Sequence, residues 1–125
     1  MRLQGVYTEL ITPFVGEQFD EEAVANLIER QIAAGVAGIV VASGGAGEGM
    51  TLRDADITTL LDLAVCVVDR RIRVISGASS NSTSAAVELA QRAERLGANG
   101  VIVTTPWLCI GFEAGSRASR AIVLN

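Results

Sequence analysis

The sequence contains neither lysine nor histidine, and arginine supplies all ten of its basic residues. Without histidine, the chain has no imidazole to act as a general base, to complete a serine-type catalytic triad or to bind a metal ion. Without lysine, none of its side chains can form a Schiff base with a carbonyl substrate. These two absences exclude several common kinds of catalysis for this chain alone.

Cysteine, positive charge and long apolar runs are also scarce. Cys66 and Cys109 are far apart and form neither a zinc-ligand spacing nor a disulfide framework, so structural or incidental roles are expected, with no metal or other cofactor. The net charge of −4 opposes binding to nucleic acid. No apolar run approaches the roughly 18 residues of a membrane helix, and no signal peptide is recognisable. A cytoplasmic protein without membrane contact is therefore expected.

The composition predicts a chain that folds. Half of the 125 residues are hydrophobic and 19% are charged, and the mean hydropathy is +0.40. This balance allows a buried core and is unlike that of disordered chains. The length fits one compact domain of ordinary size, so residues 1–125 are interpreted as a single domain.

Three stretches with apolar residues at helical spacing predict helices over residues 20–34, 51–69 and 82–96. Asp20 can cap the first helix, and Gly35 follows its last turn. Thr51 and Asp54 approximate a capping box at the start of the second. Gly97 is placed to end the third helix. The spacing therefore favours three helices separated by short connections.

Short apolar runs between these helices predict strands at residues 6–11, 39–42, 73–75 and 101–103. Their lack of alternation is typical of strands covered on both faces. Strand, helix and strand in succession indicate βαβ units with a parallel sheet and right-handed crossovers. Residues 121–124 can supply a fifth strand after the weakly helical segment 111–120. The predicted fold class is α/β with parallel βα repeats.

The loop after the second strand is the main candidate site, because parallel α/β sheets bind ligands at the carboxyl ends of their strands. In residues 43–49, small residues in succession let backbone N–H groups converge on a carboxylate or phosphate. The alternative is a turn that merely needs glycine, and the spacing leaves both open. The loop has neither a Walker A lysine nor the strict dinucleotide fingerprint.

Other candidate residues have a structural interpretation that is favoured over the functional one. Glu48 can be a general base if desolvated, but a loop glutamate that hydrogen-bonds or caps structure is favoured. The segment 81–83 is interpreted as a helix cap. Trp107 is expected to pack rather than to line a pocket or a subunit contact. The cluster of Arg70, Arg71 and Arg73 is interpreted as a solvated rim opposite the ligand face.

Together, these residues resemble the N-terminal half of the dihydrodipicolinate synthase and N-acetylneuraminate lyase family of β/α barrels. The matching motifs are Gly5-Val6-Tyr7-Thr8 with Thr12-Pro13-Phe14, Gln31-Ile32 with Gly35-Val36, Gly47-Glu48 with Thr51-Leu52, Val74-Ile75-Ser76-Gly77 with Asn81-Ser82-Thr83, and Gly97-Ala98-Asn99-Gly100. Each motif alone is weak, but the set in this order is specific. The resemblance covers residues 5–106, and residues 107–125 form a divergent tail.

The resemblance implies a lyase that acts on 2-oxo acids, typically pyruvate, through a Schiff base to lysine. It also implies that the glycine-rich loop holds the substrate carboxylate, so Gly44, Gly45 and Ala46 are the expected substrate-binding residues. Gly45 and Ala46 stand where the family has a Thr-Thr pair, which removes two hydroxyl contacts. The family's Tyr-Tyr pair appears here as Trp107-Leu108, which removes a phenol. The Gly-Gly loop and this leucine also resemble the branch that dehydrates sugar-derived 2-oxo acids.

A complete barrel takes roughly 250 residues, so the chain is expected to form about half of a TIM-type barrel, with the lysine strand beyond residue 125. If residues 122–125 match the next strand, Leu124 stands where the family has a catalytic tyrosine. No residue of the chain is therefore expected to be catalytic.

Two functions are compatible with this pattern. One is a lyase-family protein that binds a small 2-oxo acid and is inactive alone. The other is a non-catalytic, truncated half-barrel, or a fragment of a sugar-acid dehydratase. In either, a homo-oligomer is expected to cover the open sheet.

Overall fold

The computed structural model describes residues 3–105 and the strand at 120–123. The strands are β1 (Tyr7–Glu9), β2 (Phe14–Val15), β3 (Gln18–Phe19), β4 (Gly38–Val41), β5 (Arg73–Gly77), β6 (Gly100–Val103) and β7 (Arg120–Val123). The helices are α1 (Glu21–Ala33), α2 (Asp54–Val68) and α3 (Thr83–Arg95). The three predicted helices and four predicted strands are all present, with ends shifted by a few residues.

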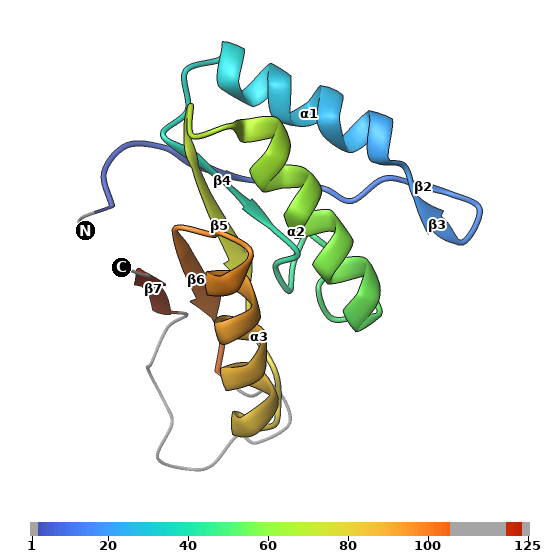
Figure 1. The fold of residues 1–125 in the computed structure, drawn as a ribbon, viewed down its shortest axis with the longest axis vertical. Coiled ribbons are helices and arrows are strands. Elements are labelled where there is room, and N and C mark those ends of the chain that lie inside the picture. The colour runs from blue at the N-terminus through green and yellow to red at the C-terminus, as the bar shows by residue number, and fades with distance from the viewer. Residues whose placement is uncertain (1–2, 106–119, 124–125) are drawn as a thin grey trace.

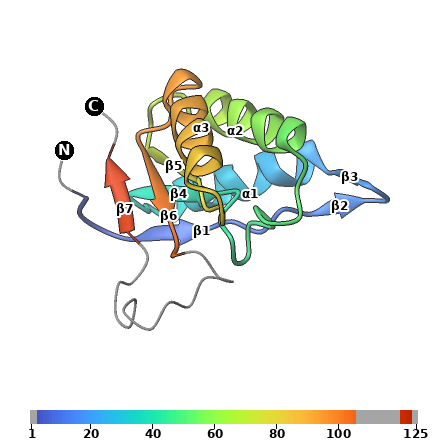
Figure 2. The same cartoon turned by 90° about the horizontal axis from the view of Figure 1, so that it is seen from below.

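The main sheet has the strand order β1-β4-β5-β6-β7, and its first four strands are parallel. Within this sheet, β1, β4 and β5 each pair with the next strand of the sheet and are connected to it through a helix, as in a TIM-type barrel. All three helices lie on the same side of the sheet (Figures 1 and 2). The predicted parallel βα architecture, about half of such a barrel, is confirmed.

The last strand departs from the βα pattern. A fifth strand is present near its predicted position, but β7 runs antiparallel to β6, with Val101 opposite Ile122. A strand in this direction is not the next parallel strand of a barrel. The residues for which the sequence suggested roles near this end, Trp107, Leu108, Cys109 and Leu124, lie outside the described residues, as does the segment 111–119.

Two of the helices begin and end as their sequences predict. The side chain of Asp20 accepts a hydrogen bond from Ala23 N at 3.0 Å at the start of α1. Ser82 does the same for the first turn of α3, so the predicted cap in segment 81–83 is confirmed. Gly35 and Gly97 follow these helices with φ of +76° and +92°, a left-handed conformation in which glycine has no steric penalty.

The predicted capping box of the second helix is wrong. The helix begins at Asp54, and Arg53 at the cap position makes no side-chain capping hydrogen bond. Thr51 Oγ1 instead donates to Glu48 Oε2 at 2.8 Å and to the Glu48 carbonyl at 3.1 Å. A hydrogen bond from a threonine hydroxyl to a nearby loop acceptor competes with capping of a helix. Here Thr51 bonds to Glu48 of the loop and does not cap α2.

The hydrophobic core lies between the helices and the sheet. Its largest buried apolar side chains come from α1, α2 and the central strands: Val24, Ile28, Ile39, Val41, Leu60, Leu61, Val68 and Val101. On the other face of the sheet, Val40 and Ile102 are only partly buried, whereas Ile75 between them is 3% exposed. The expectation of strands covered on both faces therefore holds only in part on that face, within the described residues. Among these residues, no helix is long and apolar enough to cross a membrane.

Candidate functional site

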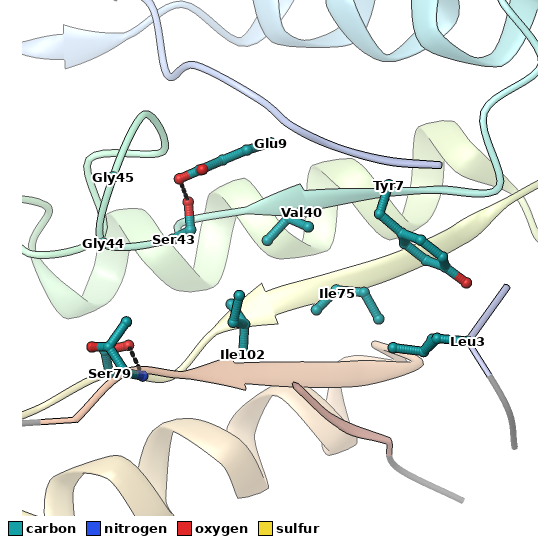
Figure 3. Close-up of a pocket in the computed structure, with 11 residues that line it drawn as sticks. Leu3, Tyr7, Glu9, Val40, Ser43, Gly44, Gly45, Ile75, Ser79 and Ile102 are labelled. Atoms are coloured by element: carbon teal, nitrogen blue, oxygen red, sulfur yellow. Dashed lines mark hydrogen bonds between the residues drawn. The ribbon is translucent and has the colours of Figure 1, made fainter. Parts of the chain in front are cut away.

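A cavity of about 440 Å³ lies on the sheet face that the helices leave uncovered (Figure 3). Its floor is apolar and comes from three neighbouring strands, with Val40, Ile75 and Ile102. Side chains with polar groups lie where the parallel strands end, and they are Glu9, Ser43, Ser79 and Thr104. The cavity is therefore placed where α/β sheets bind ligands, at the carboxyl ends of parallel strands.

The opposite end of the cavity is lined by Tyr7, whose ring lies across Gly38. Arg73 Nη1 donates to the Tyr7 hydroxyl oxygen at 3.1 Å, two strands away. A Cβ atom at Gly38 would collide with the Tyr7 ring, so glycine makes this crossing possible. Arg73 is half-buried, which corrects its interpretation as part of a solvated rim, whereas Arg70 and Arg71 are exposed.

The predicted loop after β4 is tied to the sheet by its own hydrogen bonds. Gly49 N donates to the Ser43 carbonyl at 2.8 Å, and Thr12 Oγ1 donates to the Gly47 carbonyl at 2.9 Å. The N–H groups of residues 44–46 have no acceptor among the described residues. Three successive donors thus remain available at this loop.

The three expected substrate-binding residues do not lie alike. Gly44 and Gly45 line the cavity, whereas Ala46 does not, although Gly45 and Ala46 are both exposed. A Cβ at Gly44 would meet only the flexible end of Met50, at 2.7 Å. The cavity is therefore bordered by two of the three residues.

Other glycines of this region are required by the backbone rather than by a ligand. A Cβ at Gly49 or at Gly77 would collide with the carbonyl oxygen of Ala42. Ala42 is buried and has a φ of +50°, so the chain turns sharply where these glycines approach it. A Cβ at Gly47 would lie 2.6 Å from Ser43 N. The two interpretations of the loop thus divide between its glycines, because some shape the turn and others border the cavity.

Glu9 is the residue of the cavity that the sequence interpretation missed. Ser43 Oγ donates a hydrogen bond to Glu9 Oε1, and Ser43 itself is only 5% exposed. A Cβ at Gly45 would lie 2.9 Å from the same carboxylate oxygen. The sequence does contain a signal for this residue, because Glu9 is the one acidic residue within the predicted strand 6–11.

Two further hydroxyl groups lie just beyond the ends of β5 and β6, those of Ser79 and Thr104. Ser79 Oγ accepts from Thr104 N at 3.0 Å and so holds two strand ends together. Thr104 Oγ1 is buried and has no hydrogen-bond partner among the described residues. Both residues line the cavity, so a ligand there meets hydroxyl groups as well as the loop N–H groups.

The remaining candidates lie outside the cavity. Glu48 is exposed and accepts from Thr51, which supports its structural interpretation. Cys66 is an exposed free thiol. Within residues 3–105, no cluster of His, Cys, Asp or Glu is arranged to hold a metal ion. Hydrogen bonds from Arg71 and Arg53 lower the pKa values of Glu29 in α1 and Asp56 in α2, and both carboxylates lie outside the cavity.

The sequence pattern of the dihydrodipicolinate synthetase family matches residues 2–117. The chain belongs to this family. It is 45% identical over 106 residues to the 4-hydroxy-tetrahydrodipicolinate synthase of Bartonella bacilliformis, an alignment that covers 84% of this chain and 36% of that enzyme. The corresponding enzyme of Exiguobacterium is 45% identical over 112 residues, with coverage of 89% and 38%.

Solved structures of this family share the fold. The 4-hydroxy-tetrahydrodipicolinate synthase of Methylacidiphilum fumariolicum superimposes with a TM-score of 0.81 at 38% identity, over 85% of this chain and 35% of that one. The dihydrodipicolinate synthase of Acinetobacter baumannii, solved in complex with pyruvate, gives 0.81 at 32% identity, over 85% and 36%. The chain thus spans little more than a third of the length of these relatives.

Proposed function

We propose that this chain forms the substrate-carboxylate site of a dihydrodipicolinate synthase-type lyase and that its ligand is a small 2-oxo acid such as pyruvate. The observation that carries the proposal is the set of available N–H groups at Gly44, Gly45 and Ala46, beside a cavity at the carboxyl ends of the strands. Successive backbone N–H groups in a turn bind anions, and a carboxylate is such an anion.

The pyruvate complex of the Acinetobacter baumannii relative supports the choice of ligand. With its carboxylate at the loop, the ligand places its keto and methyl groups over the apolar floor of Val40, Ile75 and Ile102. In this arrangement the chain binds and orients the 2-oxo acid. The amine that forms a Schiff base has to come from outside these 125 residues, because they include no lysine. The chain alone is therefore proposed to bind without catalysing.

Thermal unfolding of the purified chain with and without millimolar pyruvate tests this binding. A ligand that binds only the folded state raises the midpoint by mass action. We expect pyruvate to raise the midpoint for the natural chain and not for Gly45→Asp, because the new carboxylate would lie beside Glu9 and repel the ligand.

Gly16→Asp is the matched control. Gly16 lies in the turn between β2 and β3 with open space around it, and its φ of +63° is a left-handed conformation that aspartate tolerates in turns. It adds the same charge away from the loop and should keep the response to pyruvate. An equal response in Gly45→Asp would contradict the proposed place of the carboxylate. Borohydride treatment with pyruvate should leave no adduct on an internal residue, and such an adduct would contradict binding without catalysis.

A second candidate function, self-association through the open sheet, is favoured by the edge strand β1. β1 pairs only with β4 among the described strands, and Val6 and Ile11 beside it are 64% and 56% exposed. An unpaired edge flanked by apolar side chains is a template for pairing with another chain, here a second copy. Sedimentation velocity should show an oligomer, and a stable monomer at high concentration would contradict this function.

A further inference from the structure

Glu9 brings a carboxylate to the place proposed for the substrate carboxylate. It is the last residue of β1 and pairs in register with Val40 of β4, so its side chain and the loop after β4 leave the same end of the sheet. Glu9 Oε1 lies where a Cβ at Gly45 would be only 2.9 Å away. Figure 3 shows the carboxylate directed at Ser43 beside this loop.

The hydroxyl group of Ser43 donates its hydrogen bond to Glu9. A serine hydroxyl has one proton to donate and otherwise accepts. While Ser43 Oγ donates to Glu9 Oε1, it has no proton for a ligand carboxylate, which can only accept. A ligand group that carries its own donor is different, because it can donate to the free lone pairs of Glu9.

The described lining of the cavity offers no positive charge to offset Glu9. Arginine is absent from that lining, and Arg73 lies at the far end of the strands, where it hydrogen-bonds Tyr7. A second carboxylate at the loop would thus meet the charge of Glu9 without an intervening cation. Glu9 is exposed to solvent, so this repulsion is partly screened, and it acts because the Glu9 carboxylate lies next to Gly45.

We propose that Glu9 is a specificity-determining residue that weakens binding of carboxylates at Gly44 and Gly45 and favours ligands with an uncharged hydrogen-bond donor there, such as a primary amide. An amide matches both sides of the site, because its oxygen accepts from the loop N–H groups and its nitrogen donates to Glu9. The inference rests on the proposed function, since it concerns the same cavity and loop.

A comparison of pyruvate with pyruvamide in the full chain and in Glu9→Gln tests the inference. Pyruvamide keeps the keto group but replaces the carboxylate by an amide. Isothermal titration calorimetry gives Kd for both ligands, and the readout is the ratio of the pyruvate Kd to the pyruvamide Kd. We expect Glu9→Gln to lower this ratio about threefold, because only the charged ligand gains from removing a solvent-exposed charge next to Gly45. Glutamine still accepts from Ser43, so the loop is kept.

Glu48→Gln is the matched control, because Glu48 is also exposed and carries the same charge, but it lies outside the cavity. Its ratio should stay close to that of the natural chain, because this charge does not border the cavity and is screened by solvent. Measurable pyruvate binding with an unchanged ratio in Glu9→Gln would overturn the inference and leave the proposed function standing. An equal fall in Glu48→Gln would also overturn it. If neither protein binds either ligand, the proposed function fails and the inference fails with it.

Discussion

The two faces of the main sheet differ in burial, because the helices cover one face and the cavity lies on the other. On the face toward the helices, Ile39 and Val41 of β4 are at most 1% exposed, and α1 and α2 cover them. On the opposite face, the neighbouring Val40 is only partly buried and lines the cavity beside Glu9 and Ser43. Alternate residues of one strand therefore serve a closed core and an open site.

This difference teaches where the stability of the chain comes from. Burial of apolar area is the main favourable term in folding, and the helix face supplies most of it here. The cavity face adds hydroxyls, a carboxylate and free N–H groups, which contribute chemistry rather than packing. Substitutions on the helix face should thus affect folding, and those on the cavity face should affect binding.

The sharpest test compares Val41→Ala with Val40→Ala, two identical changes at adjacent positions on opposite faces. We expect Val41→Ala to lower the free energy of unfolding by about 2–3 kcal/mol, because it removes two methyl groups from a closed core and leaves a cavity. Val40→Ala should cost less than about 1 kcal/mol, because its side chain is only partly buried. Urea unfolding measures both, and equal losses would break the comparison between the faces.

A smaller effect is expected from the glycines at the carboxyl ends of the strands. Gly77→Ala should destabilise the chain by about 2 kcal/mol, because the new methyl group meets the rigid carbonyl of Ala42. Gly44→Ala should cost clearly less, since only the flexible end of Met50 has to move. The midpoints of urea unfolding give the two values. A Gly77→Ala protein as stable as Gly44→Ala would contradict the division of the glycines into turn-shaping and cavity-bordering residues.

Local sequence predicts most of the helix face. Apolar spacing and the caps at Asp20 and Ser82 place α1 and α3 within a residue or two, because both signals act within one or two turns. The hairpin β2–β3 was missed, since strands of two residues are too short to show a period. The direction of β7 depends on pairing with a distant strand, which no local pattern encodes.

The cavity face was less predictable from the sequence, because its contacts join residues that are distant along the chain. The glycine loop was recognisable because its composition is local, and two of its three expected residues, Gly44 and Gly45, do border the cavity. The role of Glu9 depends on Ser43, which lies 34 positions away and meets it only through strand pairing. The need for glycine at Gly77 likewise depends on the fold, because it arises from the close approach of the Ala42 carbonyl, which is distant in sequence.

The smallest effect is expected at the exposed ion pair between Glu29 of α1 and Arg71, which lies between α2 and β5. It sharpens the comparison by measuring how little an exposed ion pair adds to stability. Arg71 Nη1 lies 2.9 Å from Glu29 Oε2, and this hydrogen bond lowers the pKa of Glu29 below its usual 4.5. A carboxyl group whose pKa is lowered by folding adds stability above its unfolded pKa and loses it as the pH falls through the folded pKa.

Glu29→Gln should therefore be slightly less stable than the natural chain at pH 7 and equal to it once the pH is below the folded pKa of Glu29. The deficit should also shrink in high salt, because both side chains are exposed and screened. Glu17→Gln in the hairpin turn, for which the described residues show no ion pair, controls for loss of charge. Urea unfolding across pH gives the differences. A deficit in Glu29→Gln as large as that of Val41→Ala would mean that the ionic outer surface, rather than the apolar core beneath it, holds the helices on the sheet.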